Sequence, residues 1–149
     1  LHLSIRRQRQ MCIRDRRRET QEMGWQYLYQ YVVRVKVKGL EGHLKAECRP
    51  TKKGLGREVV GLRWEGERLA RVLNDDFDLK SMLLKEGLHS LKIRPDKRNQ
   101  CVRIIPKPMG WTHTGLGTIP ALGREAFPTR EAFEAYDRIA QHIRSSASA

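Results

Sequence analysis

The stretch GWQYLYQYVVRVKVKG, residues 24–39, alternates between two kinds of side chain along its length. Aromatic residues and valines occupy its odd positions, and its second half carries cations at even positions, namely Arg34, Lys36 and Lys38. A period of two, built from aromatic and β-branched residues, is typical of a β-strand that buries one face. The stretch therefore predicts a strand whose valines face a core and whose cations face solvent.

Four segments on the C-terminal side of this strand repeat the pattern. Alternation recurs in HLKAECR (43–49) and REVVGLRWEG (57–66), with the loop TKKGLG between them. The segments LHSLKIR (88–94) and CVRII (101–105), joined by a polar turn, predict a hairpin. The side chains that we expect on the inner face of these strands are Val33, Val35, Val37, Leu44, Ala46, Cys48, Val60, Leu62, Trp64, Leu91, Ile93, Val102 and Ile104.

Residues 67–87, between the two groups of strands, have the apolar spacing of a helix. The run Asn74–Asp76 in the middle of this segment consists of residue types preferred at helix N-caps. We therefore expect one helix over 67–73 and a second over 76–86, both with leucines that pack on the apolar side of the sheet.

The C-terminal third of the chain contains one further predicted helix. Residues 129–144 have an apolar stripe at helical spacing, and Thr129 is their expected N-cap. The preceding stretch, 106–128, is rich in proline and glycine and predicts a loop. Residues 145–149 are small and polar and predict a disordered tail.

The expected order of elements is β-β-β-α-β-β-α, which contains no repeated βαβ unit. This order indicates an α+β fold, with a mainly antiparallel five-stranded sheet and helices packed on one face. A single domain over 24–144 accommodates all of these elements.

The segment RRQRQMCIRD, residues 6–15, combines four arginines with a cysteine and raises a different question. Together with the preceding five residues, it resembles the translation of a common transposase sequencing adapter, without a mismatch over 1–15. The resemblance implies that these residues derive from a shotgun assembly, so we treat 1–22 as an artefactual or disordered segment and expect 1–15 to pack against nothing. It also implies that the true start is Met23 or is missing from this sequence altogether.

The charge of the chain indicates an anionic partner. The chain has 30 Lys and Arg against 17 Asp and Glu, a formal net charge of +13, and the excess persists without residues 1–15. Nucleic acid and an anionic membrane surface are the partners that such a balance favours, although a general basic bias accounts for it almost as well. The sequence contains no apolar run that approaches the roughly 20 residues of a membrane span. Cys48 and Cys101 lie far apart, as reduced core thiols of a cytoplasmic protein do.

The outward positions of the predicted strands gather cations on one face of the sheet. A basic face can follow a phosphate backbone and release its counterions. The opposing interpretation is that an open antiparallel sheet needs one solvated face, and that Lys and Arg discourage edge pairing. The candidate nucleic-acid-binding residues are Arg34, Lys36, Lys38, Lys45, Arg49, Arg63, Lys92, Arg94 and Arg103.

An aromatic stripe at the start of the first strand is the second candidate surface. Trp25, Tyr27 and Tyr29 belong to a part of the strand that can extend beyond the sheet and contact a partner. In this interpretation the protein is a protein-interaction or membrane-peripheral accessory module, and these aromatic side chains contact its partner.

Catalytic, cofactor and metal signatures are not recognisable in the sequence. Asp75, Asp76 and Asp78 lack the glycine and distal glutamate of a calcium loop, and acids in the first turn of a helix are more often structural. The histidines are scattered and no Cys-x-x-Cys occurs, so a zinc ligand set is missing. TKKGLG lacks the Gly-Lys-Ser/Thr of a phosphate loop.

These observations rank three functions. The first is a small, non-enzymatic basic binding domain without a cofactor, whose expected partner is RNA or DNA. The second is the accessory module with the aromatic strand, and the third is an enzyme of unknown class.

Overall fold

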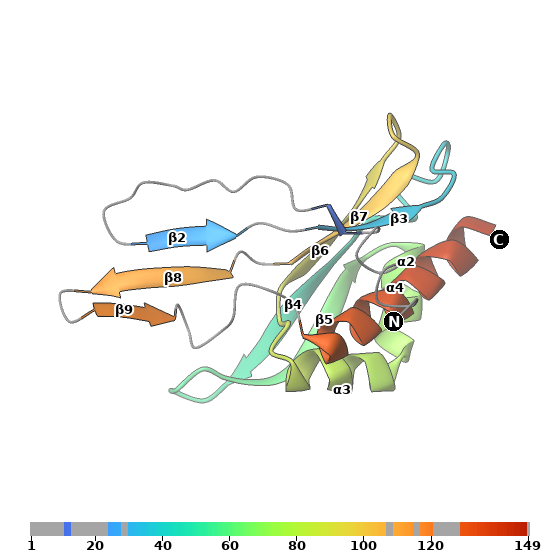
Figure 1. Ribbon diagram of the computed structural model, residues 1–149. Helices are drawn as coiled ribbons and strands as arrows, with labels where there is room; N and C mark the ends of the chain where they lie inside the picture. Colours follow the sequence, from blue (N-terminus) through green and yellow to red (C-terminus); the bar gives the residue numbers. More distant parts are fainter. Residues whose placement is uncertain are drawn as a thin grey trace.

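The computed structural model describes residues 11–12, 24–27, 30–106, 109–114, 117–120 and 129–148, and it describes side chains within 30–106 and 129–148. Figure 1 shows a twisted sheet with all the helices on one of its faces. The predicted α+β class, the antiparallel sheet and the order of its elements are confirmed.

The main sheet consists of five strands with a short sixth at one edge. In chain order, the five are β3 (Gln30–Arg34), β4 (Ala46–Lys53), β5 (Glu58–Gly66), β6 (Leu91–Asp96) and β7 (Cys101–Pro106). Their spatial order is β3-β7-β6-β4-β5, and every neighbouring pair is antiparallel. The edge strand β1 (Met11–Cys12) pairs with β3 through Tyr31 and Gln30. This pairing differs from our expectation that residues 1–15 pack against nothing.

Three helices cover the inner face of the sheet: α2 (Arg68–Asp75), α3 (Phe77–Lys85) and α4 (Arg130–Ser148). The predicted break between the first two occurs at Asp76, whose side chain caps α3 by accepting a hydrogen bond from Leu79 N at 3.0 Å. The helix α4 begins after the expected cap Thr129, which accepts a hydrogen bond from Ala132 N. It continues through Ser148, beyond the predicted end at Arg144.

The core lies between the sheet and the helices, because the alternation of the strands turns their apolar side chains to that side. Leu69 and Leu73 of α2 and Leu79 and Leu83 of α3 are fully buried there, as predicted. The buried apolar side chains of the strands and of these two helices include Tyr31, Val33, Ala46, Cys48, Leu62, Trp64, Leu69, Leu73, Leu79, Leu83, Leu91, Ile93, Val102 and Ile104.

Val60 was expected in the core, and this prediction was wrong, since its side chain is 52% exposed. Thr51 pairs with Gly61 whereas Lys52 pairs with Val59, so Val60 is an extra residue on β5. A β-bulge of this kind interrupts the alternation and turns the following residues to the other side.

The predicted first strand is also shorter than expected. β3 ends at Arg34, although Val37 and Leu44 beyond it remain fully buried. Val37 N donates to Gln100 Oε1 at 2.9 Å, so a side chain in the β6–β7 turn takes the place of a strand partner. The loop between β3 and β4 contains Gly39, whose φ of +79° favours glycine.

The expectation of a loop over 106–128 was wrong where the structure describes this stretch. The strands β8 (Met109–Thr114) and β9 (Gly117–Pro120) form a three-stranded antiparallel sheet with β2 (Gly24–Tyr27). In Figure 1 these three strands extend from one end of the main sheet. The partner of β8 lies far upstream, so local composition does not reveal this pairing.

The edge strand β5 is closed at its C-terminal end by a side chain of α2. Asn74 Oδ1 accepts a hydrogen bond from Trp64 N at 2.9 Å, and Asn74 Nδ2 donates to Trp64 O at 2.8 Å. The amide therefore pairs with the strand edge as another strand would, which discourages strand addition there.

Candidate nucleic-acid interface

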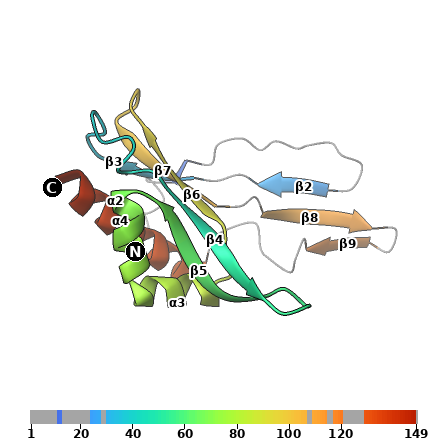
Figure 2. The same cartoon turned by 180° about the vertical axis from the view of Figure 1, so that it is seen from behind.

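The outer face is the side of the main sheet that the helices leave uncovered, as the two opposite views in Figures 1 and 2 show. The strand register places Arg103 beside both Val32 and Arg94 on this face. It places Lys92 beside Glu47, which in turn lies opposite Glu65. The outer face therefore carries cations on several strands and one pair of neighbouring acids, Glu47 and Glu65.

The structure exposes eight of the nine predicted cations. Arg103 is the exception, with a side chain that is 16% exposed. The eight exposed residues are Arg34, Lys36, Lys38, Lys45, Arg49, Arg63, Lys92 and Arg94.

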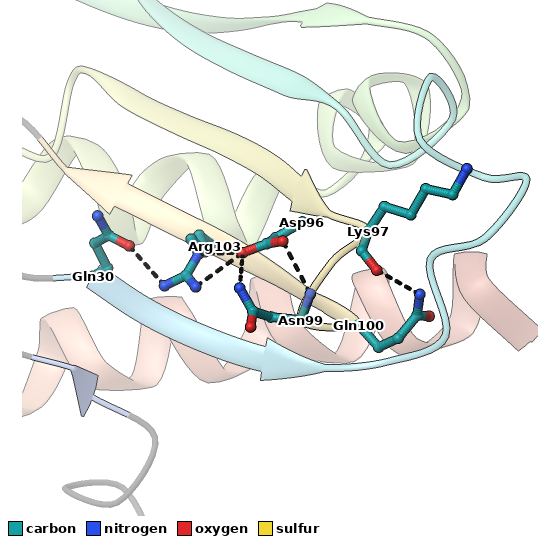
Figure 3. Close-up of polar contacts among 6 residues, drawn as sticks. All are labelled: Gln30, Asp96, Lys97, Asn99, Gln100 and Arg103. Atoms are coloured by element: carbon teal, nitrogen blue, oxygen red, sulfur yellow. Dashed lines mark hydrogen bonds and ion pairs between the residues drawn. The ribbon is translucent and has the colours of Figure 1, made fainter.

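Arg103 serves the fold, as Figure 3 shows. Its Nε and Nη2 donate to Asp96 Oδ2 at 3.2 and 3.0 Å, and its Nη1 donates to Gln30 Oε1 at 3.2 Å. Asp96 also accepts hydrogen bonds from the backbone and side chain of Asn99. The Asn99 and Arg103 hydrogen bonds lower the pKa of Asp96 to about 2. Because Arg103 is occupied by Asp96 and Gln30, we remove it from the candidate site.

Arg49 lies between the two glutamates of the outer face. Its Nε is 3.5 Å from Glu47 Oε1 and 3.3 Å from Glu65 Oε2. All three side chains are substantially exposed, so these ion pairs add little stability. They nevertheless place a cation beside both glutamates.

We call the remaining seven residues the free cations, because none of them forms an ion pair or a side-chain hydrogen bond with a residue in the described ranges. They are Arg34, Lys36, Lys38, Lys45, Arg63, Lys92 and Arg94.

The loop that carries Lys36 and Lys38 is fastened to the β6–β7 turn. Gln100 Nε2 donates to Lys97 O at 2.7 Å, while Gln100 Oε1 accepts the bond from Val37 N. Lys97 Nζ also lies 3.6 Å from Glu41 Oε1 in the same loop. The fold thus brings the β6–β7 turn, which carries the exposed Arg98, next to the loop of Lys36 and Lys38. The sequence shows Lys97 and Arg98 as neighbouring cations, but it does not show that their turn lies beside the loop between β3 and β4.

The aromatic stripe begins in β2 and continues to Tyr31 in β3. Trp25 and Tyr27 belong to β2, and Tyr29 follows it, but their side chains lie outside the described residues. Tyr31, the next member of the stripe, is buried and donates from its hydroxyl to Asp137 at 2.6 Å. Tyr31 therefore belongs to the core.

The aspartates at the α2–α3 junction form a structural cluster with α4. The Oδ2 of Asp76 lies 2.6 Å from Arg138 Nε and 2.7 Å from His142 Nε2, and the carboxylate is 7% exposed. Burial alone raises the pKa of Asp76, but the hydrogen bonds from Arg138, His142 and the Leu79 amide outweigh it, so the pKa lies well below its usual range. Within the described residues, no group of three metal-ligating side chains occurs.

The two cysteines of the domain, Cys48 and Cys101, are both buried. Burial raises the pKa of the Cys48 thiol to about 12, which disfavours the reactive thiolate.

Comparison with protein-family models, with curated proteins and with solved structures finds no match to this chain. No helix in the described ranges is long and apolar enough to cross a membrane. The function is therefore inferred from the surface chemistry of this chain.

Proposed function

We propose that the protein binds nucleic acid through the outer face of its main sheet, by contacts to phosphates. One observation carries this proposal: the free cations are exposed and unpaired among the described residues, whereas Glu47, Glu65 and Asp96 lie beside arginines. The acids of the face are thus already offset by their own neighbours. An approaching polyanion encounters the remaining positive charge.

Phosphate contacts at such a surface draw their free energy from released counterions. Each phosphate that is neutralised releases condensed cations, so the affinity falls steeply as salt rises. Lys36 and Lys38 flank Val37, whose side chain is fully buried, so their own side chains are directed to solvent. Together with Arg34 they place three exposed cations at alternate positions within five residues.

The test replaces these three cations: Arg34→Glu, Lys36→Glu and Lys38→Glu in one variant. The fold should survive, because exposed substitutions rarely cost more than about 0.5 kcal/mol each. Filter binding to generic RNA and DNA should show retention of the wild type at low salt, a steep loss as salt rises, and no retention of the variant.

A matched control separates this surface from net charge alone. Arg68→Glu, Arg71→Glu and Lys85→Glu change the charge by the same amount on exposed positions of α2 and α3, on the other side of the sheet. This control should retain most of the binding. If the wild type is not retained even at low salt, or if the sheet variant binds as well as the wild type, the outer face is a solvated sheet surface. The protein-interaction or membrane-peripheral module would then rank first.

A further inference from the structure

The β4–β5 hairpin projects from the sheet as a two-stranded arm, which we define as residues 49–63. β4 pairs with β5 over Ala46–Lys53 but with β6 only over Ala46–Cys48. Beyond Cys48 the two strands therefore have only each other as strand partners among the described residues. Pro50 lies just beyond the residues of β4 that pair with β6. Proline has no backbone N–H, and at this position no hydrogen bond to β6 requires one. Figures 1 and 2 both show the turn projecting away from the helices.

The tip of the arm combines an apolar side chain with cations. Leu55 stands at the turn and is fully exposed, at 107%. Lys52, Lys53 and Arg57 surround it in sequence, are exposed, and form no ion pair with a described residue. Glu58 is the one acid within the tip region 51–58.

The turn also permits a close approach to another molecule. The glycines on both sides of Leu55, Gly54 and Gly56, have nothing within 4 Å of the position where a Cβ would lie. Gly54 has a φ of +79°, so the turn requires its conformational freedom. The backbone beside Leu55 therefore carries no side-chain bulk that would keep a partner away from the tip.

We propose that this arm enters the minor groove of duplex DNA, and that Leu55 inserts between base pairs as an apolar wedge. Proteins that bind this groove insert apolar side chains, Leu among them, between base steps and so bend the duplex. Lys52, Lys53 and Arg57 contact the phosphates that line the groove. This inference rests on the proposed function and specifies its substrate as double-stranded DNA.

A duplex fits the arrangement of charge better than a membrane surface does. The free cation Arg63 lies at the base of the arm, and Lys92 and Arg94 continue across the outer face. A long polyanion can contact the arm and this face together, whereas a flat bilayer that receives the tip contacts little beyond it. Even a myristoyl chain alone gives only marginal membrane binding, so one leucine is a weak anchor.

The test compares the wild type with Leu55→Ser, which removes the wedge and keeps every charge. The probe is a short mixed-sequence DNA duplex with donor and acceptor dyes at its ends. We expect the wild type to bind and to raise the energy transfer by bending the duplex. Leu55→Ser should bind about tenfold more weakly, since the burial of one leucine is lost. It should leave the energy transfer near the value of free DNA, and it should keep the salt dependence of the wild type.

Val72→Ser is the matched control, because Val72 is an exposed apolar residue on α2. It should bind and bend DNA as the wild type does, and circular dichroism should show the same fold for all three proteins. If the wild type and Leu55→Ser bind and bend the duplex equally, the wedge is wrong while the proposed function stands. If the wild type fails to bind any nucleic acid but sediments with phosphatidylserine vesicles through Leu55, both proposals fall in favour of a membrane surface. Binding to neither probe overturns both proposals.

Discussion

Among single residues, Leu73 tests the packing of the helical layer against the sheet. Leu73 lies on α2, and its side chain is completely buried in the core, with 0% exposure. We expect Leu73→Ala to lower the free energy of unfolding by roughly 2–5 kcal/mol, because truncation of a buried leucine loses apolar burial and leaves a cavity. Urea denaturation followed by circular dichroism measures this cost.

The adjacent Val72 provides the control for Leu73. It is 37% exposed on the same helix. Val72→Ala should therefore change the free energy of unfolding by no more than about 0.5 kcal/mol. Equal effects of the two substitutions would contradict the packing of α2 described above.

The helices are tied together by Asp76. One carboxylate oxygen caps α3, while the other accepts bonds from Arg138 and His142 of α4. Arg138 Nη2 also lies 3.6 Å from the exposed Asp78. Asp76 therefore couples the start of one helix to the face of another, in addition to the apolar contacts between them.

We expect Asp76→Asn to lower the free energy of unfolding by about 2–3 kcal/mol at neutral pH, because hydrogen bonds to a charged group are lost or weakened. The pKa of Asp76 is lowered by the fold, so its stabilising effect is present above the unfolded-state pKa of about 4. It is lost as the pH falls further. Urea denaturation at pH 7 and pH 3 should therefore show a smaller difference between wild type and variant at pH 3.

Asp75 is the natural control for this experiment. It is the preceding residue, it is exposed, and it forms no ion pair within the described ranges. Asp75→Asn should leave the stability nearly unchanged at both pH values. A wild-type to Asp76→Asn difference that is the same at pH 7 and pH 3 would show that the charge of Asp76 does not stabilise the helix junction.

For the whole molecule, the described part of the N-terminal segment adds one short edge strand to the main sheet. The strand β1 contributes two residues, Met11 and Cys12, which pair with one edge of the main sheet. The buried apolar residues that form the described core run from Tyr31 to Ile143.

Deletion of residues 1–15 should consequently leave the melting temperature unchanged within error. The missing pairing is short, and the sheet retains its five long strands. Differential scanning fluorimetry of the full and shortened chains measures the difference. A loss of several degrees would show that this segment is part of the native fold.

The residues of the candidate site follow partly from the sequence pattern and partly from the tertiary structure. The alternation of residues 34–38 and 91–94 was enough to predict which cations face solvent, because side chains of a strand point to opposite faces in turn. The same pattern could not show that Arg103 bonds to Asp96 or that Arg49 lies between two glutamates. Such pairs depend on strand register and side-chain conformation, which the pattern of single strands leaves open.

The sequence by itself determined the class of the fold, the five main strands, the break at Asp76 and most of the core, because these follow from periodicity and capping within short segments. Only the tertiary structure decided the pairing of β2 with β8, the bulge at Val60, and the bonds of Asp76 to α4. In the last case the partners are 66 residues apart. Interactions of this kind form only when distant segments meet, so no local pattern of residues specifies them.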